Sequence, residues 1–348
     1  METVLFLAHT EPDGSLGKPA LEALGAARTL SLTLAEARLA AGLVGEQVQP
    51  AANAIAASGT ARFLAVAGAD FAQSRYASDA AAIEALCKAS QATFIIAPAT
   101  ARWNRVAAGV AHRMGGGVDT HVTGIAAASG AVQVNRWYYR QRLEAVLERP
   151  QRPWFIVVDP GTHAPYEGEA GAAPVEFIPV DLPESCKRTS VAGVRQPAAD
   201  AQTIRPGAAL LLVAGAGWTK KQADGQLHVK EAEKLILDCL RLTRASLGSS
   251  KSLVDLSSEG QAVLGFLSHL NQIGQTGSTP RHPKGLAACC HGEEPHTVGW
   301  RFINERRAIN LDPNCGWARG KTDVLYVADA FAVMAKVNEL LEALMPAT

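Results

Sequence analysis

The chain has 348 residues, of which 48% are hydrophobic and 19% charged, so we expect a globular protein with a sizeable core rather than a disordered chain. Lys plus Arg and Asp plus Glu both number 33, and the resulting zero net charge gives little attraction to nucleic acid or to an anionic membrane. The apolar stretches are too short to span a bilayer, the N-terminal residues lack the features of a signal peptide, and the six cysteines lie scattered. These features favour a cytoplasmic protein without a disulfide framework.

Short apolar runs alternate with helical patterns along the whole chain, which is typical of parallel β-α units. We therefore expect an α/β protein with two doubly wound parallel sheets. The predicted strands, in chain order, are Val4–Ala8, Phe63–Ala67, Phe94–Ala97, Phe155–Val158, Ala209–Ala214, Leu286–Cys290, Ala308–Leu311 and Val324–Ala328.

Three sets of apolar residues recur at the spacing of one helix face. Each set predicts a helix, and the cysteine in the second set is expected to lie in the core. The sets are Ala107, Val110, Ala111 and Met114; Ala232, Leu235, Ile236, Cys239 and Leu240; and Val333, Val337, Leu340, Leu341 and Leu344.

The helical and strand patterns fade between about residues 161 and 206, where Pro, Gly and Ala accumulate. A linker in such a stretch would cost little. We therefore predict an N-terminal α/β domain over residues 1–190, a linker over 191–205 and a C-terminal domain over 206–348.

The last third of the chain holds the densest polar motifs, and its outer motifs stand at the ends of short apolar runs. The ends of parallel strands are where an open α/β sheet binds its ligands. Small residues, amides, hydroxyls and imidazoles alternate there, which suits a polar, partly aromatic cofactor. The motifs are Gly274-Gln275-Thr276-Gly277, His291-Gly292-Glu293-Glu294-Pro295-His296, Ile309-Asn310-Leu311-Asp312 and Val327-Ala328-Asp329.

Taken in order, these motifs resemble the alpha subunit of the electron transfer flavoprotein family, and the likeness covers almost the whole chain. Gly248-Ser249-Ser250-Lys251 resembles the glycine-small-serine-basic turn of that family. Near the start, Val4–Ala8 and the helical segment from Lys18 to Arg28 resemble its first strand and helix, although these N-terminal motifs are individually short. The order and spacing of the C-terminal motifs carry most of the resemblance.

The resemblance implies a Rossmann-like C-terminal domain that binds one FAD. It also implies a heterodimer with a beta subunit, docked on the N-terminal domain, that passes electrons from donor dehydrogenases to a membrane quinone reductase. Gln275 and Thr276 would face the flavin ring, His296 would lie near the pyrimidine carbonyl, and Asn310 would hold the adenosine end. The full set of implied cofactor-binding residues is Ser250, Lys251, Ile273, Gly274, Gln275, Thr276, His291, Gly292, His296, Asn310 and Asp329.

The residue types suit that chemistry. A bound flavin carries the redox reaction, so the protein supplies position and electrostatics. Lys251 and His296 are the candidates to stabilise an anionic flavin, and the Thr276 hydroxyl can donate or accept a hydrogen bond. Gly274 and Gly277 allow backbone amides to approach a ligand closely.

The chain also departs from the family pattern. Gly217 stands where the family usually has an arginine, and Lys251 replaces another arginine, although lysine lacks the planar guanidinium fork. Glu293 and Glu294 place acids near a site meant to favour an anionic flavin. These changes motivate an alternative, a scaffold or regulatory paralogue without productive flavin chemistry.

A metal site in the segment from Cys289 to His296 is the third hypothesis, because Cys, His and carboxylate side chains all bind metal ions. Adjacent residues of a strand point to opposite faces, so Cys289 and Cys290 would not easily bind one ion together. No second Cys or His pair occurs at zinc-finger spacing. The sequence therefore favours the flavin protein, with no metal.

Overall fold

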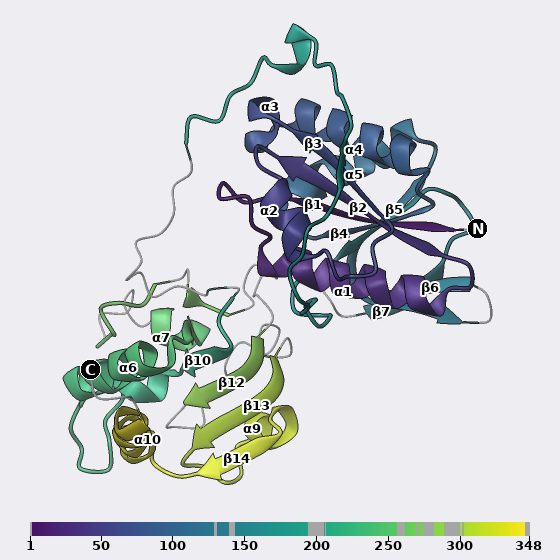
Figure 1. Ribbon diagram of the computed structural model, residues 1–348. Coiled ribbons are helices and arrows are strands. Elements are labelled where there is room, and N and C mark those ends of the chain that lie inside the picture. Colours follow the sequence, from purple (N-terminus) through teal and green to yellow (C-terminus); the bar gives the residue numbers. More distant parts are fainter. Residues whose placement is uncertain are drawn as a thin grey trace. The chain divides into compact units, whose positions relative to one another are not determined.

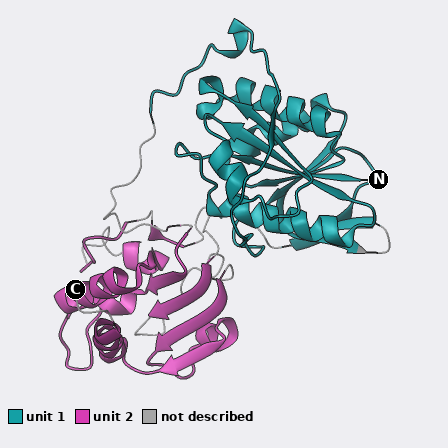
Figure 2. Cartoon of the chain, viewed as in Figure 1, with its two compact units in different colours: residues 1–195 teal, residues 196–348 magenta. Residues whose placement is uncertain are grey.

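The computed structural model describes residues 2–128, 131–138, 143–193, 205, 207–255, 262–268, 271–273, 282–288, 300 and 303–344. The chain divides into two compact units, Met1–Arg195 and Gln196–Thr348 (Figure 2). Each unit is an α/β structure built on its own sheet, which confirms the predicted fold class.

The sheet of the first unit has nine strands in the order β7-β6-β5-β8-β4-β1-β2-β3-β9. The pairings on either side of β1 are parallel, whereas β5 pairs with β6 and β6 with β7 in antiparallel fashion. The strands are β1 (Thr3–His9), β2 (Arg38–Gly45), β3 (Arg62–Ala67), β4 (Phe94–Pro98), β5 (Gly117–Ala128), β6 (Ala131–Tyr138), β7 (Leu143–Glu148), β8 (Trp154–Val158) and β9 (Val175–Phe177). The sheet of this unit is therefore mostly parallel, and an antiparallel ribbon of β5, β6 and β7 extends one edge.

Helices cover both faces of this sheet (Figure 1). One face packs against α1 (Lys18–Thr33) and α2 (Gln49–Ala54). The other face packs against α3 (Ala69–Ala72), α4 (Tyr76–Ser90) and α5 (Ala101–Arg113). Helix α5 confirms the first predicted helix. Beyond β9, a short 3-10 turn, η1 (Glu184–Cys186), precedes the end of the unit.

A buried carboxylate ties the antiparallel ribbon to the parallel part of the sheet. Asp119 of β5 is fully buried and accepts hydrogen bonds from Arg136 Nη1 at 3.0 Å, Trp154 Nε1 at 2.9 Å and the Arg149 guanidinium. Burial alone would raise the pKa of Asp119, but the hydrogen bonds from Arg149, Trp154 and Arg136 hold it below its ordinary value. The carboxylate therefore stays charged and holds β6, β7 and β8 in register.

The sheet of the second unit is parallel throughout, in the order β11-β10-β12-β13-β14. In chain order this is 2-1-3-4-5, one of the two common doubly wound arrangements. Its strands are β10 (Leu210–Ala214), β11 (Ser246–Ser249), β12 (His282–Ala288), β13 (Ile303–Asn310) and β14 (Val324–Val327). Its helical elements are η2 (Ala216–Thr219), α6 (Val229–Thr243), α7 (Lys251–Asp255), α9 (Gly316–Lys321) and α10 (Ala330–Leu344).

The core of the second unit lies on both faces of its sheet. The first face packs against α6 and α10, and the second packs against α9 together with Trp300. All five predicted apolar residues of α6 are buried, so the second predicted helix is confirmed and Cys239 lies in the core.

Helix α10 confirms the third predicted helix but buries a different face. Its buried residues are Ala330, Phe331, Met334 and Asn338, whereas Leu340 and Leu344 are 53% and 80% exposed. Apolar residues occur all around this helix, so the sequence spacing alone could not choose the face that packs against α6.

Candidate cofactor site

Ligands of open parallel sheets bind beyond the carboxyl ends of the strands, where the chain changes direction across the sheet. In the second unit β11 lies on one side of β10 and β12 on the other. The change of direction therefore falls between β10 and β12, beyond Ala214 and Ala288, which pair with each other. We place the candidate site along this carboxyl edge.

The turn after β10 lies next to the end of β12. The Gly215 N–H donates to Ala288 O at 3.1 Å, and the Gln222 amide donates to Gly217 O at 3.0 Å. Trp218 is fully buried, with its ring centroid 4.7 Å from that of Phe331, so it is a packing residue.

Ser250 and Lys251 follow β11 directly. The Ser250 N–H donates to Ala214 O at 2.9 Å, which holds this segment against the end of β10, and its hydroxyl accepts from Leu253 N at 3.3 Å. The Lys251 ammonium is exposed and lies 2.6 Å from the Asp255 carboxylate, a hydrogen bond that raises the pKa of Lys251. Lys251 is therefore charged, but an acid one helical turn away offsets much of that charge.

Ile273 lies beside the end of β11. It is fully buried, and its N–H donates to Ser249 O at 3.2 Å. A Cβ on Gly248 would lie 2.5 Å from Ile273 Cγ2, so only glycine allows the two segments to approach this closely. The close packing fixes the residue that directly precedes Gly274.

The other two described site residues end β13 and follow β14. Asn310 is fully buried, and its Oδ1 accepts from Asp312 N at 2.9 Å. Asp329 is half-buried, and its carboxylate accepts from Ala332 N at 2.9 Å, so it caps the start of α10. All five described members of the predicted set therefore lie along one edge of one sheet, although Asp329 has a structural task as well.

The remaining predicted residues, namely Gly274, Gln275, Thr276, His291, Gly292 and His296, lie outside the described residues. The proposed metal segment, Cys289–His296, lies outside them too. Within the described ranges no group of three or more His, Cys, Asp or Glu side chains could hold a metal ion.

Buried polar atoms without a partner mark this edge as fit for a ligand. Ser249 Oγ, Asn310 Nδ2 and both amide atoms of Gln272 have no hydrogen-bond partner among the described residues, and all three residues are at most 6% exposed. Each unpaired buried group costs about 1–3 kcal/mol unless a ligand or water pairs with it. Other such atoms, for example His9 Nδ1 and Trp103 Nε1, lie in the first unit, but four of them gather along this one sheet edge. FAD offers hydroxyls, phosphates and ring amide groups, so these residues fit that cofactor. The sequence did not single out Gln272, because glutamine signals nothing until its burial is known.

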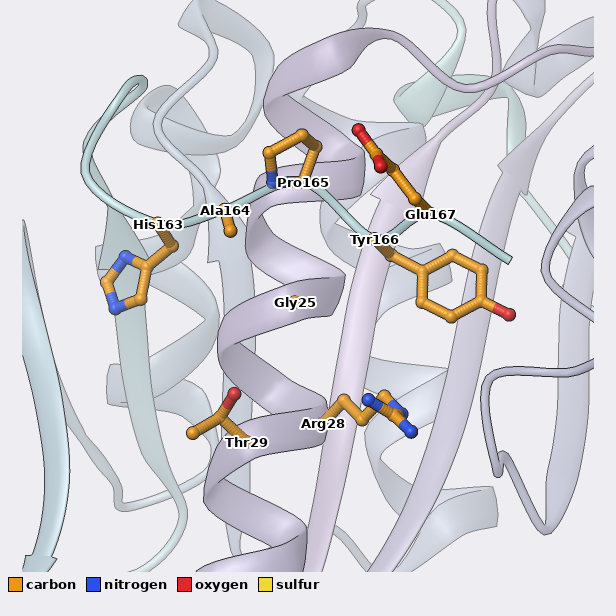
Figure 3. Close-up of a pocket in the computed structure, with 8 residues that line it drawn as sticks. All are labelled: Gly25, Arg28, Thr29, His163, Ala164, Pro165, Tyr166 and Glu167. Carbon is orange, nitrogen blue, oxygen red and sulfur yellow. The ribbon is translucent and has the colours of Figure 1, made fainter.

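The first unit has a recess of its own, which is a second candidate ligand site (Figure 3). It has a volume of about 280 Å³ and lies between α1 and the segment from His163 to Glu167. Thr162 donates its hydroxyl proton to Asp159 O at 2.7 Å, so its 3.0 Å contact with His163 Nδ1 is donated by the imidazole. Burial lowers the pKa of His163, which leaves a neutral ring. This volume lies below the range typical of drug-sized ligands, so the recess is too small for FAD.

The fold defines an α/β protein of two units, each built on its own sheet. The family model described as the electron transfer flavoprotein domain matches residues 4–183, just over half of the chain. The chain therefore belongs to the electron transfer flavoprotein family, whose members carry electrons rather than convert substrates. A search of curated proteins gave no match. None of the helices in the described part of the chain combines the length and apolar character that a membrane crossing requires.

Proposed function

We propose that this protein is the alpha subunit of an electron transfer flavoprotein and binds FAD at the carboxyl edge of its second unit. The order and spacing of the motifs from Gly274 to Asp329 support the alpha subunit rather than the beta subunit. The observation that carries the proposal is the set of buried, unpartnered polar groups at this edge, Ser249 Oγ and Asn310 Nδ2 among them.

The bound flavin would supply the redox chemistry, accepting and releasing electrons. The chain's own residues would position it. Asn310 would hold the adenosine end through its unpartnered Nδ2, Gln275 and Thr276 would contact the ring, and His296 and Lys251 would supply donors and positive charge. Asp255 would moderate the charge of Lys251.

The partner in this proposal is the beta subunit, in a heterodimer that docks through the N-terminal unit. Donor dehydrogenases would deliver electrons to the flavin, and a quinone reductase would collect them, each in a transient complex. The family membership supports this assignment, and the cytoplasm is the compartment that the composition favours.

The test is the absorbance spectrum of the protein co-produced with its beta partner. A flavin spectrum, with FAD identified after denaturation, is the expected result. An Asn310→Leu variant should bind FAD more weakly, since it removes the unpartnered amide. A colourless heterodimer that takes up no added FAD would contradict the proposal.

A second candidate function is a scaffold or regulatory paralogue that keeps the partner surface without productive flavin chemistry. The 2.6 Å pairing of Lys251 with Asp255 favours it, because this pair weakens a positive charge that an anionic flavin needs. Gly217, in place of an arginine, points the same way. Stepwise reduction separates the two functions: a carrier takes up electrons reversibly, and a scaffold shows no redox change.

A further inference from the structure

Gln272 is a buried glutamine that the chain itself leaves unsatisfied. It is 6% exposed, and neither its Nε2 nor its Oε1 has a hydrogen-bond partner among the described residues. Its neighbour Asn271, which is 2% exposed, uses its amide within the protein, since Oδ1 accepts from Ser268 N at 3.1 Å and Nδ2 donates to Leu247 O at 3.3 Å. Burial at this point therefore does not by itself prevent an amide from finding partners.

The position of Gln272 places it at the candidate cofactor edge. Its backbone pairs in parallel with Ser249, the last residue of β11, and it stands two residues before Gly274. Ser249 is fully buried, and its hydroxyl likewise has no partner within the described ranges. Residues paired across neighbouring strands extend their side chains on the same face. Two unpaired polar side chains thus lie together where the sheet ends.

The chemistry of the amide restricts what could satisfy it. Nε2 needs an acceptor and Oε1 needs a donor. A phosphate oxygen only accepts, so a phosphate would leave Oε1 unpaired. A sugar hydroxyl both donates and accepts, and the imide edge of a flavin ring carries an N–H between two carbonyls. Either group can pair with both amide atoms, Nε2 and Oε1.

We propose that Gln272 is a cofactor-binding residue that contacts FAD through a group able to donate and accept together, a sugar hydroxyl or the imide edge of the ring, and not through a phosphate. This inference rests on the proposed function. It explains why the chain keeps a buried glutamine that costs stability when no cofactor is bound.

The test is Gln272→Met in the full chain, co-produced with its beta partner and stripped of flavin. Methionine keeps the length of the side chain and removes both polar atoms. The FAD dissociation constant should rise about tenfold, which corresponds to about 1.4 kcal/mol. The unfolding temperature of the apoprotein should rise at the same time, because an unpaired buried amide is gone. These opposite signs distinguish a ligand contact from a structural residue.

Asn338→Leu is the matched control. Asn338 is also 6% exposed, and its Oδ1 has no partner among the described residues, but its Nδ2 donates to Leu235 O at 2.9 Å between α10 and α6. The control should lower the unfolding temperature of the apoprotein and leave FAD affinity unchanged.

The midpoint potential of the bound flavin separates the two kinds of contact. A contact to the imide edge shifts the potential in Gln272→Met, whereas a contact to a sugar hydroxyl lowers affinity without a shift. Unchanged FAD affinity would overturn the inference, and so would a joint loss of affinity and apoprotein stability. A wild-type complex that binds no FAD would instead contradict the proposed function, before any variant is compared.

Discussion

The contact between Gly248 and Ile273 allows a quantitative test of how the site is built. In Gly248→Ala the new Cβ would lie 2.5 Å from Ile273 Cγ2, whereas ordinary contact begins at 3.4 Å, so the two segments must separate by about 0.9 Å. Overpacking of this kind costs about 1–3 kcal/mol. Alanine also lowers the conformational entropy of the unfolded chain, which offsets about 0.4–1 kcal/mol of that cost. The free energy of unfolding should therefore fall by about 1–2 kcal/mol.

The same displacement moves Gln272, which adjoins Ile273, so FAD affinity should fall as well. Urea unfolding and flavin titration measure the two effects. Gly320→Ala, in α9, is the matched control, because a Cβ there meets nothing within 4 Å and alanine favours a helix. A Gly248→Ala protein that unfolds and binds FAD like the wild type would refute the reasoning.

Three further predictions concern charge and packing. Asp119→Asn should lower the free energy of unfolding of the first unit, measured in urea, by about 3–5 kcal/mol, because two arginines lose their buried counter-ion. The folded state lowers the pKa of Asp119. The stability that this carboxylate contributes should therefore be fully present above about pH 4 and be lost as the pH falls through the lowered pKa. Asp255→Asn should raise the flavin midpoint potential by about 30 mV, a tenfold change for a two-electron couple, whereas Asp238→Asn, which breaks a similar lysine pair at 2.7 Å in α6, should not. Met334→Ala, on the packed face of α10, should lower the free energy of unfolding by about 2–5 kcal/mol, and Leu340→Ala, on its exposed face, by less than about 0.5 kcal/mol. Thermal unfolding measures both changes, and equal decreases would mean that the packed face of α10 is misassigned.

Several strands buried on both faces could be predicted from sequence, although β2, which is buried from Leu39 to Gly45, was not predicted. The runs at β1, β4, β8 and β10 are continuous and apolar, because helices cover both sides of each strand. The ribbon strands β6 and β7 were not predicted, since they carry Gln, Asn, Arg and Glu side chains on a partly exposed surface. Their place depends on Asp119, a contact that no local pattern reveals.

Strand β11 shows a different limit. Its sequence, Ser246–Ser249, has one large apolar residue, and its extended form follows from pairing with β10 and from the approach of Ile273. Tertiary context, and not intrinsic preference, decides such a strand. The motif Gly248-Ser249-Ser250-Lys251 was predicted as a turn, but its first two residues belong to β11 and only Ser250 and Lys251 lie beyond the strand.

The order of the motifs in the sequence predicts which residues belong to the candidate site. The described site residues come from four separate segments of the sequence, yet the parallel topology brings them to one edge. They are Ser250 with Lys251, Ile273, Asn310 and Asp329. The tasks of the individual side chains could not be predicted, because a cap, an ion pair and an unpaired amide depend on neighbours in space. The family match covers residues 4–183, the half whose motifs are individually short.

Hydrogen exchange of the heterodimer with and without FAD would locate the cofactor on the chain. FAD bound at the carboxyl edge of the second sheet should slow exchange of backbone amides at the ends of β10, β11 and β13, around residues 214–219, 248–251 and 310–312. Protection confined to the first unit, for example around residues 163–167, with no change at the carboxyl edge of the second sheet, would contradict this location.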